Sequence, residues 1–303
     1  WATFFRQLGF SVLLSPRSTR KIYELGMESI PSESECYPAK LAHGHVQWLI
    51  DHGVRTIFHP CVFYEHQETP GAQNHFNCPI VVSYPENLKN NVDAIGEDGV
   101  TYLRPFLAFT DEKTAAKRLA DFCKETWSIS ASETRAAVHA AWLEQQRAKA
   151  DIRAQGAAAL AWIEQNHGRG IVLAGRPYHV DPEVNHGIDQ LIIRQGAAVI
   201  SEDSVSWHEQ KFQTSVLNQW TYHSRLYAAA KYCTENPDMD LVQLVSFGCG
   251  LDAVTTDETR EILQAGSKLY TQLKIDEITN LGAVNIRLRS LFAALEERKE
   301  DKK

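Results

Sequence analysis

Short apolar runs that end at a glycine or cysteine turn alternate with longer helical patterns through the second half of the chain. The run Ile171-Val172-Leu173-Ala174 has the composition of a strand that is buried on both faces. By the same criteria, we predict strands at 171–174, 197–200, 241–245 and 268–275 and helices at 188–195, 222–233, 256–265 and 280–298. Strands that alternate with helices pair in parallel through right-handed crossovers, so this half is predicted to be a Rossmann-like α/β lobe.

The first half repeats this alternation less regularly. A helix that begins near Pro38 and ends at Gly53 leads into a strand at 54–58. Further short strands are expected at 11–15, 27–30, 79–84 and 103–107. A brief helix at 20–25 is expected to stop at Gly26 in a left-handed conformation, which glycine adopts most easily.

Two helical stretches rich in Ala, Glu, Gln and Arg follow, at 111–127 and 132–167. Ser130 and Ser132, with Glu133 behind them, are candidate caps for the second stretch. A long helical segment is therefore expected between the two halves.

The chain as a whole is predicted to be an α/β protein with two Rossmann-like lobes and mostly parallel sheets. The lobes are expected at residues 1–110 and 169–303, joined by a helical linker at 111–168. The stretch from Trp1 to Gly9 has the pattern of a helix end, and we expect the strand before it to lie upstream.

Composition excludes several partners. A formal net charge of −7 without a basic face argues against nucleic acid. No apolar run approaches the roughly 18 residues that cross a bilayer, so no membrane partner is expected. Six cysteines without a secretory signal predict a reducing compartment, the cytoplasm, and argue against a disulfide framework.

Three cysteines lie where a strand ends or a helix begins. Cys36 precedes the helix that starts near Pro38, Cys61 follows the strand at 54–58, and Cys249 follows the strand at 241–245. The carboxyl edge of an α/β sheet is where ligands and cofactors usually bind. Helix N-termini also favour the thiolate, which is the form that binds metal or attacks electrophiles. These three sulfurs are candidate metal ligands.

The other three cysteines have different settings. Cys123 and Cys233 lie within amphipathic helices and are expected in the core. Cys78 precedes Pro79 and is either structural or a fourth ligand. The wide spacing of all six differs from the compact pairs of a zinc ribbon.

Polar groups near these segments could support a site. His43, His45 and His59 flank the first two cysteines and could ligate a metal, although ordinary hydrogen bonding is the commoner role of such histidines. The loop after the strand at 171–174 is dense in functional groups and could bind an acyl-CoA or a partner domain, or could be a hydrogen-bonded structural loop. Its candidate residues are Arg176, Tyr178, His179, Asn185 and His186. No GxGxxG motif follows the first visible strand of either lobe, which disfavours a nucleotide-binding Rossmann enzyme.

Three long motifs carry a family resemblance. They are Cys-Tyr-Pro-Ala-Lys-Leu-Ala-His-Gly-His at 36–45, Gly-Arg-Pro-Tyr-His-Val-Asp-Pro-Glu-Val-Asn-His-Gly at 175–187, and Ser-Phe-Gly-Cys-Gly-Leu-Asp-Ala at 246–253. With them, the chain resembles the acyl-CoA dehydratase activase-related proteins, also described as CoA-substrate-specific enzyme activases. That family is similar to the subunits of 2-hydroxyglutaryl-CoA dehydratase.

The resemblance implies a cofactor and a partner. The dehydratase subunits hold a [4Fe–4S] cluster through three cysteines, two in the first lobe and one in the second, which corresponds to Cys36, Cys61 and Cys249, with Cys78 as a candidate fourth ligand. Larger family members carry ATPase domains of the actin/hexokinase type, so such a domain is the expected partner, in the same chain or another. This segment has no phosphate-binding glycine-rich loop and is not itself expected to bind ATP.

Two functions remain open from the sequence. The first is an iron–sulfur redox component of an ATP-dependent 2-hydroxyacyl-CoA dehydratase or reductase system, and hence a component of a lyase or reductase. The second is a non-catalytic scaffold or partner-binding module whose cysteines hold zinc or no metal.

Overall fold

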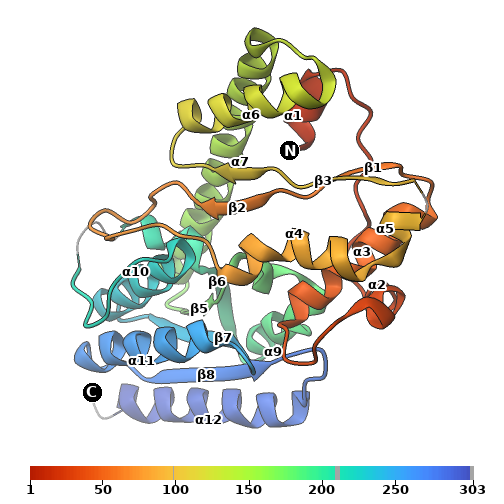
Figure 1. Cartoon of the computed structure of the whole chain (residues 1–303). Coiled ribbons are helices and arrows are strands. Elements are labelled where there is room, and N and C mark those ends of the chain that lie inside the picture. The colour runs from red at the N-terminus through yellow and green to blue at the C-terminus, as the bar shows by residue number, and fades with distance from the viewer. Residues whose placement is uncertain (98, 209–211, 301–303) are drawn as a thin grey trace. The chain divides into compact units, whose positions relative to one another are not determined.

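The chain folds into two compact units (Figure 1), and the computed structural model describes residues 1–97, 99–208 and 212–300. The first unit comprises residues 1–67, 74–151 and 219–221, and the second comprises residues 68–73, 152–218 and 222–303. The segment predicted as a helical linker forms helices α6 (Glu112–Trp127) and α7 (Ala131–Gln165). Residues of α7 belong to both units, and the three-part division of the chain stays a prediction.

A parallel sheet of four strands forms the centre of the second unit. In sheet order, its strands are β6 (Ala197–Ser201), β5 (Arg169–Ala174), β7 (Met239–Ser246) and β8 (Tyr270–Ile275). Val172 lies opposite Leu241, and Leu244 lies opposite Leu273. All residues of β7 are buried, as expected for a central strand covered on both faces. The sheet confirms the α/β class that the apolar runs predicted.

Helices pack on both faces of this sheet (Figure 1). The helical elements of this part of the chain are η2 (Pro177–Val180), α8 (Pro182–Asn185), α9 (Ile188–Arg194), η3 (Glu202–Ser204), η4 (Ser206–His208), α10 (Thr221–Glu235), α11 (Gly250–Ala265) and α12 (Leu281–Glu300). Val172 packs in one core with Leu226 of α10 and Leu263 of α11. The next residue back, Ile171, packs in the other core with Ile192 of α9. Successive strand residues point to opposite faces, so each apolar run serves both cores.

The first unit has shorter strands. The strands β1 (Thr56–Phe58) and β3 (Thr101–Leu103) pair in parallel, as do β2 (Cys61–Tyr64) and β4 (Phe106–Ala108). The remaining helical elements are α1 (Ala2–Gln7), α2 (Arg20–Gly26), η1 (Met27–Ser29), α3 (Tyr37–Asp51), α4 (Pro79–Asn91) and α5 (Asp93–Glu97). Among the described residues, no helix combines the length and the apolar composition that crossing a lipid bilayer needs.

Two glycines let α2 and α3 approach closely. A Cβ on Gly44 would lie 1.7 Å from the carbonyl oxygen of Ile22, and one on Gly26 would lie 2.3 Å from the backbone nitrogen of Gly44. The φ angle of Gly26 is −101°, so the left-handed stop predicted there is wrong. Glycine is needed at this position for close backbone packing, and the close contact fixes α3, which begins just after Cys36.

The strand predicted at 79–84 is wrong, because these residues form the first half of α4. Cys78 is the N-cap and Pro79 is the first helical residue, a position that proline favours. Of the apolar residues, Tyr84 and Leu88 are buried, at the spacing of one helical turn. The β-branched run suggested a strand, but burial at this spacing decided for a helix.

Three other predicted strands differ from the structure. Residues 11–15 have no regular secondary structure, and residues 27–29 form the 3₁₀ helix η1. The strand predicted at 103–107 is two separate strands, with Arg104 and Pro105 between them. Proline lacks the N–H that a continuous strand would need there.

Candidate functional site

The most complete polar cluster lies at the carboxyl edge of the second unit's sheet, around Cys249. The strand β7 ends at Ser246, and a short turn places Cys249 as the N-cap of α11. The half-buried sulfur accepts a hydrogen bond from the backbone N–H of Asp252 at 3.4 Å. The thiol thus lies where the amides of the first helical turn are unpaired within the helix.

Arg176 approaches the same sulfur from the neighbouring strand, β5. Its Nη2 donates to the Sγ of Cys249 at 2.7 Å and to the Oδ1 of Asp252 at 2.8 Å. The second carboxylate oxygen of Asp252 accepts the backbone N–H of Ser246 at 2.9 Å. Arg176 and Asp252 are 4% and 3% exposed, so this is a buried ion pair whose polar atoms point toward the thiol.

His179 holds the backbone of Arg176. Its Nδ1 accepts the backbone N–H of Arg176 at 2.9 Å, so the neutral ring carries its proton on Nε2. Burial and the charge of Arg176 lower the pKa of His179 to about 3. A Cβ on Gly175 would lie 2.1 Å from the same Nδ1, so glycine is required before the arginine. The buried Nε2 has no protein partner among the described residues.

The charge of Arg176 also lowers the pKa of a second buried histidine, His223. His223 of α10 is 3% exposed, and burial together with the charge of Arg176 lowers its pKa to about 3. Both histidines are therefore neutral at physiological pH, and neither adds positive charge beside Arg176.

The pKa of Cys249 reflects opposing influences. Burial raises it most, and the carboxylate of Asp252 raises it further. Arg176 and the backbone N–H groups of Leu251 and Asp252 act in the opposite direction. A cation at the sulfur would offset the cost of the buried charge, so these donors suit a metal-bound thiolate.

The rest of the loop at 175–187 is tied to the protein. Asn185 is buried and accepts the backbone N–H of Gly187 at 2.8 Å. His186 donates from Nε2 to the carbonyl oxygen of Asp276, after β8, at 2.6 Å. Tyr178 is partly buried beside His179, with ring centroids 4.6 Å apart. The sequence did not indicate that this loop, through Arg176, contacts Cys249.

Cys36 immediately precedes α3 in the first unit. It is the N-cap, and its side chain makes no capping hydrogen bond. The preceding residue, Glu35, accepts hydrogen bonds from the hydroxyl of Tyr84 at 2.6 Å and the side-chain amide of Asn87 at 3.1 Å. Two side chains of α4 thus fix the turn that carries Cys36.

Cys61 is the first residue of β2 and is 4% exposed. Burial raises the pKa of this thiol, the carboxylate of Glu86 raises it further, and Arg104 lowers it. At both Cys61 and Cys249, burial and a nearby carboxylate raise the pKa of the thiol, and a nearby arginine lowers it.

The candidate histidine ligands of the first unit are engaged in hydrogen bonds. His43 is buried, with Nδ1 2.7 Å from the Oγ of Ser29 and Nε2 2.9 Å from the Oη of Tyr84. The Nδ1 of His59 lies 2.7 Å from the hydroxyl of Tyr102. Burial lowers the pKa of both histidines to about 4.

His45 and Cys78 are also held by local contacts. The Nε2 of His45 lies 3.2 Å from the hydroxyl oxygen of Ser18. Cys78 caps α4 without a side-chain capping bond, and its backbone N–H donates to Asn77 at 2.9 Å. The predicted core cysteines, Cys123 and Cys233, are both 0% exposed, which confirms their packing role.

The predicted cluster ligands belong to different units, with Cys36, Cys61 and Cys78 in the first and Cys249 in the second. Within the described part of the chain, no group of three or more His, Cys, Asp and Glu side chains has the arrangement of a metal site. All six cysteines are free thiols. The donor set around Cys249 fits a thiolate ligand, and the three-cysteine site stays a proposal.

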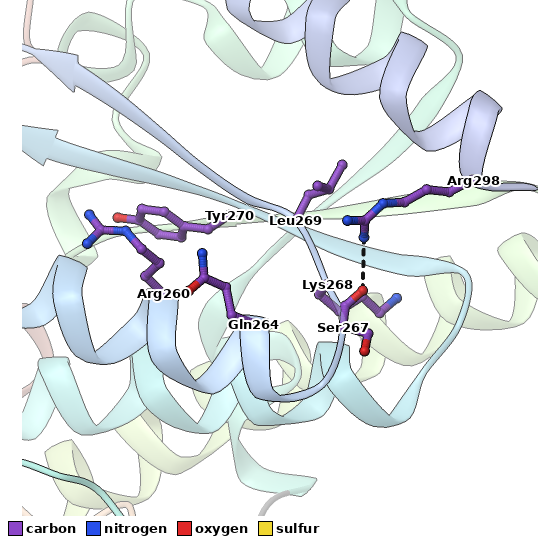
Figure 2. A pocket seen from close by; sticks show the side chains of 7 residues that line it. All are labelled: Arg260, Gln264, Ser267, Lys268, Leu269, Tyr270 and Arg298. Carbon is purple, nitrogen blue, oxygen red and sulfur yellow. Dashed lines mark hydrogen bonds between the residues drawn. The ribbon is translucent and has the colours of Figure 1, made fainter.

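A separate pocket lies at the opposite end of α11 (Figure 2). Its basic side chains already have protein partners. Lys268 donates to the carbonyl oxygens of three residues, Arg298 to that of Ser267 at 2.9 Å, and Arg260 to Asp257 at 2.8 Å. Because α11 is about 24 Å long, this pocket is remote from Cys249, and we assign it no part in the site.

A four-stranded parallel sheet with helices on both faces makes the second unit a Rossmann-like α/β unit, and ligands usually bind at the carboxyl edge of such a sheet. Residues 1–205 match the family model described as the CoA enzyme activase uncharacterised domain, and the chain belongs to that family. The match confirms the resemblance expressed by the sequence motifs. It includes Cys36, Cys61 and the Arg176 loop, whereas Cys249 follows the matched residues. No curated protein matches the chain.

Proposed function

We propose that the protein is the iron–sulfur redox component of an ATP-dependent 2-hydroxyacyl-CoA dehydratase or reductase system in the cytoplasm. Its [4Fe–4S] cluster would be bound by Cys36, Cys61 and Cys249, with Cys78 as the candidate fourth ligand. An ATPase domain of the actin/hexokinase type, in the same chain or another, would be its partner.

The observation that carries this proposal is the setting of Cys249. Its sulfur has a guanidinium donor 2.7 Å away and a backbone amide 3.4 Å away, and both stabilise negative charge on the sulfur. The sulfur is only half-buried, so a metal can reach it. Hydrogen bonds to cysteine sulfur are a principal means by which proteins tune iron–sulfur clusters. Membership of a CoA enzyme activase family supports the same class of chemistry.

The first unit supplies complementary features. Cys36 is the N-cap of α3, and a helix N-terminus favours the thiolate form of a cysteine. Cys61 is more buried, and a metal cation would compensate the cost of its thiolate. When bound, the cluster would supply one-electron transfer, and the chain's own residues would hold it, donate hydrogen bonds to sulfur and exclude water.

The test is reconstitution with iron and sulfide under anaerobic conditions, followed by measurement of iron, acid-labile sulfide and the EPR spectrum after reduction. Separate Cys36→Ala, Cys61→Ala and Cys249→Ala variants are each expected to lose the cluster. Cys123→Ala and Cys233→Ala are matched controls, because both thiols are enclosed in apolar cores, and they should keep it.

Iron that is absent from the parent, or present regardless of the three substitutions, would refute the cluster assignment. Stoichiometric zinc that depends on the same cysteines would instead support the scaffold function, in which the site is structural. Loss of iron only in Cys78→Ala, with the other three variants unaffected, would also contradict the proposed ligand set.

A further inference from the structure

We propose that Arg176 is a positioning residue for Cys249, and that Asp252 and His179 fix Arg176 for this role. The inference rests on the proposed function only where it concerns the bound cluster. In this proposal, the role of the loop at 175–187 is to support the thiol of Cys249. The loop is then not a separate site for a substrate or a partner.

The contacts form a continuous chain from backbone to sulfur. The turn after β5 is closed by His179, which accepts the backbone N–H of Arg176 at 2.9 Å. From this fixed backbone, the guanidinium extends to the Sγ of Cys249 and the Oδ1 of Asp252. Asp252 in turn accepts the backbone N–H of Ser246 at 2.9 Å.

Sheet order explains why these residues meet. The strands β5 and β7 are neighbours and parallel, so the loops that follow them emerge at the same edge. Arg176 is the second residue after β5, and Cys249 is the third after β7. A buried arginine needs partners on its planar guanidinium, and the carboxylate and sulfur at this edge supply them.

The arrangement differs from an ordinary structural ion pair. Asp252 alone could neutralise Arg176, yet the same Nη2 atom that contacts the carboxylate also lies 2.7 Å from the sulfur. Asp252 also donates its backbone N–H to that sulfur. The thiol therefore receives two N–H donors, and the negative charge of Asp252 limits the net positive charge beside it.

The first experiment uses cluster-free full-length protein and follows alkylation of Cys249 by iodoacetamide at one fixed pH, with mass spectrometry of the Cys249 peptide. Arg176→Gln should slow alkylation about tenfold, the scale of a lost hydrogen bond to a charged group. Arg176→Lys should restore part of the rate, because lysine keeps the charge and loses the planar fork.

Asp252→Asn should act in the opposite direction and speed alkylation, since it removes negative charge and keeps one acceptor oxygen. If Arg176 and Asp252 merely supported folding, Arg176→Gln and Asp252→Asn would change the alkylation rate of Cys249 in the same direction. Arg287→Gln is the matched control. Arg287 is also in the second unit, but it donates to the carbonyl oxygen of Gln272, at 2.7 Å, and the variant should leave the alkylation rate of Cys249 unchanged.

The second experiment measures the reduction potential of the reconstituted cluster by EPR-monitored titration. Arg176→Gln should shift the potential to lower values and Asp252→Asn to higher values, because net charge and hydrogen bonds to sulfur set cluster potentials. Circular dichroism and thermal melting identify variants that fail to fold. If Arg176→Gln is one of them, Arg176→Lys and Asp252→Asn decide the question.

The two proposals fail separately. A parent that binds no iron refutes the proposed function, and the alkylation rates still test Arg176. The positioning role is overturned if two results occur together. The first is a cluster with the same reduction potential in the parent, Arg176→Gln, Arg176→Lys and Asp252→Asn, and the second is unchanged or faster alkylation in Arg176→Gln. These results would leave the cluster assignment in place.

Discussion

Arg176 and Cys249 are separated by 73 positions in the chain and joined by a hydrogen bond of 2.7 Å. The contact joins the polar loop at 175–187 to the turn that carries Cys249. From the sequence, these two segments were separate candidate sites. It depends on the neighbouring placement of β5 and β7 in the parallel sheet.

Gly175→Ala should lower the free energy of unfolding by about 1–3 kcal/mol, the usual cost of overpacking. The new methyl group would lie 2.1 Å from the Nδ1 of His179, so the turn would have to open. Urea unfolding measures the change. Gly250→Ala is the control, since its Cβ would meet nothing within 4 Å, and a loss of equal size there would contradict the steric explanation.

Tyr84→Phe should lower the free energy of unfolding by about 1–3 kcal/mol, because it removes the hydroxyl that pairs with the Nε2 of the buried His43 and a hydrogen bond to Glu35. Burial raises the pKa of Tyr84, so its neutral hydroxyl donates to Glu35 and faces the Nε2 of His43. Chemical unfolding of the variant provides the measurement. Tyr64→Phe removes a single, partly exposed bond to Asn74 and should cost less; an equal cost would count against the buried network.

His59 should make the protein less stable in acid. Burial lowers its pKa from 6.5 to about 4, so between these values the unfolded chain binds a proton that the folded chain does not. The free energy of unfolding should fall as pH drops through this window, by roughly 1 kcal/mol for this group at pH 5.5.

Unfolding curves at pH 7.5 and pH 5.5 test this, and His59→Gln should show a smaller difference between them than the parent. Tyr102→Phe removes the hydrogen bond to His59 but keeps the ring buried, so it should retain the difference. If His59→Gln and the parent respond equally to pH, His59 is not the group responsible.

Ser130→Ala should lower the free energy of unfolding by about 1 kcal/mol, the usual value of an N-cap. The Oγ of Ser130 accepts the backbone N–H of Glu133 at 3.2 Å, and the carboxylate of Glu133 accepts the backbone N–H of Ser130 at 3.2 Å. Ser132 was an equal candidate in the sequence, but it lies inside α7. Thermal or urea unfolding should therefore show a smaller effect for Ser132→Ala, and the reverse order would contradict this cap.

The sequence predicted the second unit well. Its four strands agree with the apolar runs, because a strand covered on both faces needs a nearly continuous apolar segment. The helix predicted at 256–265 begins earlier in the structure, at Gly250. The core positions of Cys123 and Cys233 were also predictable from helical burial. The first unit was less predictable, since its strands have only three or four residues and carry little periodic signal.

The sequence by itself determined the four strands of the second unit and the helix start after Cys36, because composition and spacing express local preferences and burial. Tertiary structure decided that residues 79–84 are helical, since packing of Tyr84 and Leu88 on the core outweighs the β-branched run. It also decided that Gly26 serves a close helix contact and that Arg176 meets Cys249. These outcomes depend on which distant segments share an edge or a face, and local sequence preferences do not contain that information.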